Sequence, residues 1–214
     1  MNRKRRTYTL HKRAQAAQDT RLSIVEATRT LLAETGYPEI SLDDIAGRAG
    51  VSRQTIYVQF GSKSGVLQAV GEHIEQAALE GLIPTLLQAS NPIDALRSGL
   101  ERVAQFYEHD AQVLRNLHAQ TVYDASYATV WRNKQLEIWR NTRRLVEWLD
   151  LDGCLTAAWS VDEATDWLWA ASSFESYHQL VSERGWTAEQ FVQRIMQLVE
   201  KTLLAHEDGA HPRK

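Results

Sequence analysis

The stretch Gly50–Val70, GVSRQTIYVQFGSKSGVLQAV, decides the fold. Ser52 is a natural N-cap, and the residues after it predict a short helix over 53–60. Ile56 and Phe60 lie four residues apart and therefore share one face, which can anchor this helix to a core. The opposite face carries hydrogen-bonding side chains that cannot all be buried cheaply, so we expect it to point outward.

The residues before this stretch predict a partner helix. Ser41 is a second N-cap, and two aspartates follow it in the first turn, where the helix dipole favours acids. The helix that begins there is expected to run to about Ala49, and Gly50 permits the tight turn that follows. Residues 41–60 therefore predict a helix-turn-helix.

A helix anchored by one edge and polar on the other suits the major groove of DNA. Arg53 can pair bidentately with guanine and Gln54 with adenine, while Val58 can touch a thymine methyl group. Backbone N–H groups at the helix starts suit phosphates. The predicted DNA-contact set is Ser41, Ser52, Arg53, Gln54, Thr55, Tyr57, Val58 and Lys63. The alternative is a small helical bundle with a polar surface helix.

Charge is distributed unevenly along the 214 residues. Residues 1–71 hold 11 Lys and Arg against 6 Asp and Glu, whereas residues 72–214 hold 13 against 21. A basic end on an acidic remainder indicates that one end meets a polyanion. A solvated basic tail is the alternative, because six of those basic residues fall within residues 3–13.

The rest of the chain predicts an all-α protein, because prolines and glycines are few and strand-like alternation is absent. We expect an N-terminal helix-turn-helix domain and a larger helical domain. The predicted boundaries are a disordered basic arm over 1–18, the DNA-binding domain over 19–71, the larger domain over 72–205 and a tail over 206–214. Within the larger domain we expect breaks near Pro84, before Ala111 and near residue 150, then helices over about 161–183 and 187–205.

Residues 21–70 resemble the DNA-binding domain of the TetR family of transcriptional regulators. The resemblance lies in the Gly36–Tyr37 end of the first helix, in SLDDIAGRAGVS from residue 41, and in Tyr57, Phe60 and Lys63. It implies that Tyr57 and Lys63 hold phosphates and that Arg53, Gln54, Thr55 and Val58 face bases. A departure is Ser64, since an acid often follows the lysine in the family.

The C-terminal residues 162–204 are similar to the last two helices of many family members, which usually form the four-helix bundle of a homodimer. Small residues over 170–173 permit close helix approach, and an apolar stripe follows the last helix. The predicted interface set is Ala170, Ala171, Phe174, Phe191, Ile195, Leu198 and Thr202. The alternative is that both helices only close the core of the monomer.

All seven tryptophans fall between residues 131 and 186. Family members usually bind a small molecule in this domain, and aromatic side chains with a few polar groups commonly line such cavities. The resemblance therefore implies an unidentified effector, apolar or aromatic in character. The pocket candidates are Phe106, His118, Tyr123, Trp131, Trp139, Trp167 and His178. Ordinary core packing is the alternative for each of them.

Other function classes find little support in the sequence. No HExxH, H-x-x-x-H, GxSxG or glycine-rich phosphate loop occurs, so we predict no enzyme, no catalytic residue, no metal and no cofactor. A single cysteine, Cys154, fits a reducing cytoplasm, and no apolar run could span a membrane. The sequence thus predicts a cytoplasmic, homodimeric, ligand-responsive regulator of transcription and favours a repressor that binds operator DNA. The alternatives are a helix-turn-helix activator or architectural protein without an inducer, and a helical enzyme.

Overall fold

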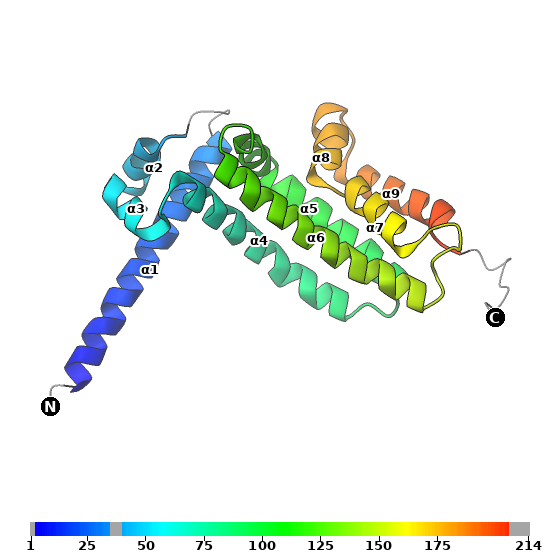
Figure 1. Cartoon of the computed structure of the whole chain (residues 1–214), viewed down its shortest axis with the longest axis horizontal. Helices are drawn as coiled ribbons and strands as arrows, with labels where there is room; N and C mark the ends of the chain where they lie inside the picture. Colours follow the sequence, from blue (N-terminus) through cyan, green and yellow to red (C-terminus); the bar gives the residue numbers. More distant parts are fainter. Residues whose placement is uncertain (1–2, 35–39, 206–214) are drawn as a thin grey trace. The chain divides into compact units, whose positions relative to one another are not determined.

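The structure, a computed structural model, describes residues 3–34 and 40–205, and each regular element among them is helical (Figure 1). The all-α prediction is confirmed. The predicted tail over 206–214 and the Gly36–Tyr37 helix end lie outside the described residues. In chain order the elements are α1 (Arg3–Glu34), α2 (Leu42–Ala49), α3 (Arg53–Phe60), α4 (Lys63–Leu87), α5 (Pro92–Gln120), α6 (Ala125–Leu151), α7 (Val161–Ala171), α8 (Phe174–Tyr177), the π-helical segment η1 (His178–Glu183) and α9 (Ala188–Thr202).

The chain divides into two compact units. The first comprises residues 1–75 and 112–130, and the second comprises 76–111 and 131–214. The sequence assigns residues 112–130 to the larger domain, whereas here they pack in the first unit. Two hydrogen bonds give the reason, since Asn116 donates to the Leu32 carbonyl at 2.5 Å and Ser64 donates to Asp124 at 2.6 Å. Neither long-range pairing could be read from sequence spacing.

The core of the first unit collects apolar side chains from every helix that enters it. On α1 the buried residues recur at helical spacing, so one face of the helix is covered and the other is exposed. Each burial of such a side chain contributes about 1.5–3 kcal/mol. The fully covered members, exposed by 1% or less, are Ile24, Leu32, Ile45, Ile56, Val66, Leu67, Val70 and Leu117.

The start of α1 differs from the sequence prediction. Residues 1–18 were expected to be disordered, but α1 begins at Arg3. Residues 14–17, Ala-Gln-Ala-Ala, are strong helix formers and continue directly into the buried part of α1, which explains the extension. Residues 12–19 are all exposed, so propensity and not packing sustains this part of the helix.

Two predicted breaks in the following helices are milder than expected. Pro84 lies inside α4, which continues to Leu87, and the Gln88 N–H donates to the Pro84 carbonyl at 3.2 Å. A proline lacks only its own N–H, so the residues after it can remain helical. In α5 the break before residue 111 is a kink at Asp110, which has φ −112° and ψ 18°.

In the second unit, the helix predicted over 161–183 is divided into α7, α8 and η1. Ser172 ends α7, and Ser173 begins α8 by accepting a hydrogen bond from the Ser176 N–H at 3.2 Å. Serine side chains compete with the helix for backbone groups, so a Ser-Ser pair favours such an interruption. Near the end of α9, a short antiparallel bridge joins Leu155 to Leu204.

Gly65 allows α4 to approach the last turn of α3. A Cβ atom at this position would lie 2.1 Å from the carbonyl oxygen of Phe60 and 3.1 Å from its carbonyl carbon. Both are backbone atoms, so they cannot swing aside as the end of a side chain would. Gly71, on the same helix, would place its Cβ with nothing within 4 Å.

We therefore expect Gly65→Ala to lower the free energy of unfolding by about 1–3 kcal/mol, the usual cost of overpacking. The matched control, Gly71→Ala, should leave stability unchanged or raise it by up to about 1 kcal/mol, because alanine favours helix. Urea denaturation followed by circular dichroism measures both. Equal stabilities of the two variants would show that α3 and α4 do not make this close approach.

Candidate nucleic-acid interface

The turn between α2 and α3 is built from local contacts. Ser41 and Asp44 form a reciprocal cap at the start of α2, with the Asp44 N–H donating to Ser41 Oγ at 3.1 Å and the Ser41 N–H donating to Asp44 Oδ2 at 2.8 Å. The Ser41 hydroxyl, which donates to the same Oδ2 at 2.6 Å, and the Ser41 N–H hold the pKa of Asp44 below its usual value. Gly50 ends α2 at φ 66°, a left-handed conformation that suits glycine. The predicted helix-turn-helix is confirmed.

Helix α3 has one buried side and one open side. Its N-cap, Ser52, accepts a hydrogen bond from the Thr55 N–H at 3.1 Å, and Ile56 is fully buried. Arg53, Gln54, Tyr57 and Val58 are exposed, with Thr55 and Ser52 at the edge of the same surface. Val58 is 74% exposed, which is unusual for an apolar side chain on a helix that packs in a core and fits contact with a partner.

Arg53 is paired with an acid in the absence of DNA. Its Nη1 atom lies 3.2 Å from Asp43 Oδ2, and both side chains are more than half exposed. Exposed pairs of this kind contribute at most about 1 kcal/mol. The pair therefore orients Arg53 while leaving it available to a stronger acceptor.

The C-terminal end of α3 is held by Arg21, a residue that the sequence reasoning missed. Arg21 donates from Nη1 to the Gln59 carbonyl at 2.9 Å, and its guanidinium lies 4.2 Å from the centroid of the Phe60 ring. A cation at a helix C-terminus also interacts favourably with the helix dipole. No local sequence pattern predicts this contact, because Arg21 and Gln59 are 38 residues apart in the chain.

Lys63 stands at the start of α4 beside an acidic neighbour that the sequence did not predict. Burial lowers the pKa of Lys63, and Asp124 opposes that effect through its charge. Asp124 accepts hydrogen bonds from Ser64 Oγ at 2.6 Å and from the Tyr127 N–H at 3.0 Å. These contacts, the Ser64 bond above all, hold the pKa of Asp124 below its usual value, so it is ionised near neutral pH. Lys63 is thus a partly covered cation at the edge of the α3 surface.

The predicted pocket candidates do not share one compact unit. His118 and Tyr123 lie in the first unit, where Tyr123 is 67% exposed, whereas Phe106, Trp131, Trp139, Trp167 and His178 lie in the second. All seven tryptophans are partly exposed, so none is a fully buried core residue. Trp167 packs against Trp159 with ring centroids 6.3 Å apart, and His178 stacks on Phe174 at 5.9 Å.

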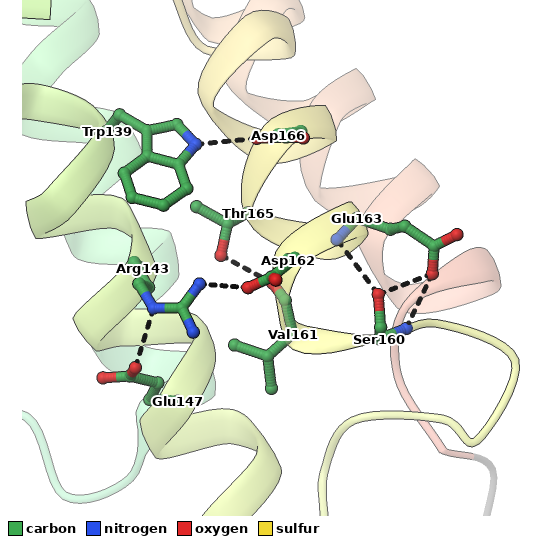
Figure 2. Close-up of polar contacts among 9 residues, drawn as sticks. All are labelled: Trp139, Arg143, Glu147, Ser160, Val161, Asp162, Glu163, Thr165 and Asp166. Carbon is green, nitrogen blue, oxygen red and sulfur yellow. Dashed lines mark hydrogen bonds and ion pairs between the residues drawn. The ribbon is translucent and has the colours of Figure 1, made fainter. Parts of the chain in front are cut away.

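Trp139 takes part in a polar contact between α6 and α7 (Figure 2). Its indole Nε1–H donates to Asp166 Oδ1 at 2.7 Å. One turn further along α6, Arg143 pairs with Asp162 of α7 and with Glu147 of its own helix at 2.9 Å. The close contact with Asp162 raises the pKa of Arg143. The structure therefore gives Trp139 a role in joining two helices.

An aromatic cluster in the second unit was also missed by sequence reasoning. Tyr107 and Tyr177 lie 5.3 Å apart by ring centroids, and Tyr177 packs edge-on against Phe191 at 5.2 Å. Tyr107 donates from its hydroxyl to the Ser172 carbonyl at 3.3 Å. Tyr177 is 1% exposed, and its hydroxyl has no hydrogen-bond partner among the described residues. A buried polar atom without a partner is uncommon and can mark a ligand site.

The predicted dimer candidates fall into two groups. Phe174, Phe191 and Ile195 are buried within the single chain, each exposed by 5% or less, so they have little surface left for a partner. Phe191 and Ile195 belong to the core because the amphipathic face of α9 packs on its own unit, and Phe174 is a buried residue of α8. Ala170, Leu198 and Thr202 are exposed and Ala171 is partly exposed. Only this second group offers surface to a second chain.

Two further searches covered the described residues. No group of three or more His, Cys, Asp or Glu side chains in this part of the chain could hold a metal ion. No helix in the same part is long and apolar enough to cross a membrane.

The segment that contains α2 and α3 matches a known protein family. Residues 24–70 match the family "Bacterial regulatory proteins, tetR family". This segment contains the whole helix-turn-helix, the anchoring residue Ile56 and the start of α4. This part of the chain is therefore similar to the tetR family of bacterial regulatory proteins.

Several characterised regulators are similar to part of the chain. The regulator AlkX of Mycobacterium tuberculosis is 33% identical over 48% of the chain and 42% of its own length. The activator FasR and the repressor LfrR, both of Mycolicibacterium smegmatis, are 28% and 34% identical over 52% and 42% of the chain. These matches span 48% and 44% of FasR and LfrR, so the chain spans less than half the length of the curated relatives it matches.

The fold as a whole also has solved counterparts. A TetR transcription regulator from Haloarcula marismortui superposes with a TM-score of 0.71 and 15% identity, covering 88% of this chain and all of the other. This likeness shows the fold. The proteins matched are transcriptional regulators and not enzymes, in agreement with the sequence prediction.

Proposed function

We propose that this protein regulates transcription by inserting α3 into the major groove of operator DNA. The observation that carries the proposal is the division of α3 into a buried side, at Ile56, and an exposed side with Arg53, Gln54, Tyr57 and Val58. Arginine and glutamine offer the paired donors and acceptors that distinguish guanine and adenine in the major groove. The proposed site of action is the cytoplasm.

We further propose that Lys63 and the backbone at the starts of α2 and α4 hold phosphates, so that these contacts set the register of α3 without reading sequence. Repression is the favoured sign, by analogy with LfrR, which is a repressor. FasR is an activator, and activation is therefore the competing hypothesis for the same DNA contact. Both hypotheses require the same DNA-contacting residues. They differ only in the position of the operator on the DNA.

Substitutions should distinguish the residues that read bases from the residue that holds phosphates. Arg53→Ala or Gln54→Ala should cost about 1–3 kcal/mol of discrimination at one position of a selected operator. Lys63→Ala should weaken binding to all sequences alike and reduce the salt slope by about 1. Sequence selection followed by titration of duplexes at several salt concentrations measures both effects. Arg132→Ala, an exposed charge removed from α6 in the second unit, is the control.

Equal losses on selected and random DNA for all three variants would contradict the division of roles. If the wild-type protein selected no sequence at all, the proposed function itself would fail.

We propose a homodimer, because two recognition helices about 34–36 Å apart can read two half-sites one DNA turn apart. The exposed side chains of α7 and α9 supply the candidate surface, with Leu198 49% exposed on α9. Thr202 lies four residues further along α9 and is exposed on the same face, so the two side chains can contact a partner together.

Leu198→Arg should bury an unpaired charge at this interface and convert dimers to monomers. Leu151→Arg is the matched control, since Leu151 is 85% exposed at the end of α6. Sedimentation velocity measures the assembly state and titration measures operator affinity. If Leu198→Arg stayed dimeric and bound DNA like the control, the dimer surface would have to lie elsewhere.

We also propose that a small apolar or aromatic effector opposes DNA binding from the second unit. The support is the unpaired, buried hydroxyl of Tyr177 within an aromatic cluster, next to the π-helical segment η1. Such segments frequently occur at functional sites. A hundredfold weakening of DNA binding requires about 2.7 kcal/mol of coupling, and operator DNA must then weaken the effector equally.

An apolar and aromatic compound library, screened by tryptophan fluorescence, should yield compounds that bind the wild-type protein. Tyr177→Phe removes only the unpaired hydroxyl, so the melting temperature should hold while affinity for those compounds falls about tenfold, the value of one hydrogen bond. Trp139→Phe removes the contact to Asp166 and should leave their affinity nearly unchanged. Compounds that bind Tyr177→Phe as tightly as the wild type would remove Tyr177 from the site.

A further inference from the structure

The N-terminal part of α1 leads into the core of the first unit. Residues 12–19 are all exposed, and among the side chains described on this helix Ile24 is the first that is fully buried. Gln15 donates to Asp19 at 2.9 Å and Thr20 donates to the Ala16 carbonyl at 2.8 Å, both within the same helix. We call residues 3–19 the basic arm, because they include six Lys and Arg and a single acid.

The charges of the basic arm do not serve its own helix. No acidic residue occupies the first turn of α1, where the helix dipole favours negative charge. Six basic residues in seventeen repel one another. Because residues 12–19 are all exposed, packing adds little to the stability of this part of the helix, and a helix without such support is marginal in water. A polyanion would remove that repulsion. The basic composition of the arm is therefore explained by an anionic partner and not by the fold.

The arm leads into the part of α1 that contacts the recognition helix. Arg21, two residues after the arm, donates to the Gln59 carbonyl at the end of α3. With a rise of 1.5 Å per residue, a continuous helix carries Arg13 about 12 Å and Arg3 about 27 Å from Arg21 along the axis. This reach extends well beyond the eight residues of α3 and is comparable with one turn of duplex DNA, about 34 Å.

DNA suits the arm better than a membrane does. A helix that lies on a membrane needs a broad apolar face beside its basic one. The only large apolar residues in the arm are Tyr8 and Leu10. Phosphates require only charge and donors, which the arm has in excess.

We propose that the basic arm is a second DNA contact, which binds the phosphate backbone outside the base pairs read by α3. The proposal rests on the proposed function, because it assigns the arm to the same DNA. Binding is independent of sequence, since lysine and arginine hold phosphates as charges. Each phosphate neutralised adds about 0.9 to the slope of log affinity against log salt.

The test uses the full-length chain with all six basic residues of the arm changed to glutamine. The control changes six exposed basic residues of the second unit, all outside α7 and α9, to glutamine, which alters the net charge equally: Arg97, Arg102, Arg132, Arg140, Arg144 and Arg184. The probes are the operator selected by the wild-type protein, the same operator lengthened by about 10 base pairs of random sequence at each end, and random duplex.

We expect lengthening to strengthen binding of the wild type and the control and to have little effect on the arm variant. The arm variant should also show a salt slope lower by about 1 or more per chain, while its base preferences remain those of the wild type. If the arm variant responds to length and salt as the control does, the arm makes no DNA contact.

Two other outcomes separate this proposal from its alternatives. If the wild-type protein selects no operator, the proposed function fails, and the salt slopes on random duplex still decide whether the arm binds phosphates. Vesicles of phosphatidylserine and phosphatidylcholine test the membrane alternative. Arm-dependent binding to vesicles, without any arm-dependent effect on DNA, would overturn the proposal.

Discussion

The position of α3 depends on the close approach of α4 at Gly65, where any side chain would collide with the Phe60 carbonyl. An eight-residue helix is too short to be stable alone, so its tertiary contacts must set its orientation. Ile56 fixes the middle of α3 in the core, and Arg21 holds its last turn through the Gln59 carbonyl and the Phe60 ring. With both its middle and its end held, α3 presents its remaining face as a fixed surface.

Much of this surface can be predicted from the sequence because it depends on local rules. An N-cap serine bonds to an N–H two or three residues away, so Ser41 and Ser52 are recognisable in the sequence alone. A glycine between two short helical patterns predicts a turn through the left-handed backbone conformation, and Gly50 has that conformation. The buried and open faces of α3 follow from the period of 3.6 residues, which the position of Ile56 confirms.

The rest could not be predicted because it depends on residues distant in sequence. Arg21 and Asp124 bond to partners 38 and 60 residues away, and no periodicity marks either pairing. The apolar stripe on α9 was assigned to a dimer, but a stripe looks the same whether it faces a partner or its own core. Phe191 proves to face the core. Tyr177 was missed because an unpaired hydroxyl is a property of its surroundings, which the sequence does not contain.

The recognition surface combines a rigid support with side chains that are weakly held. Arg53 is restrained only by an exposed ion pair with Asp43, so exchanging that carboxylate for a guanine costs about 1 kcal/mol or less. Lys63, in contrast, is partly covered, and the charge of Asp124 acts on it, so its ammonium group is less open to solvent than the Arg53 guanidinium. A partly covered cation can set the register of the complex, while a loosely held arginine can adjust to the base it meets. These different restraints are what a division between phosphate holding and base reading requires.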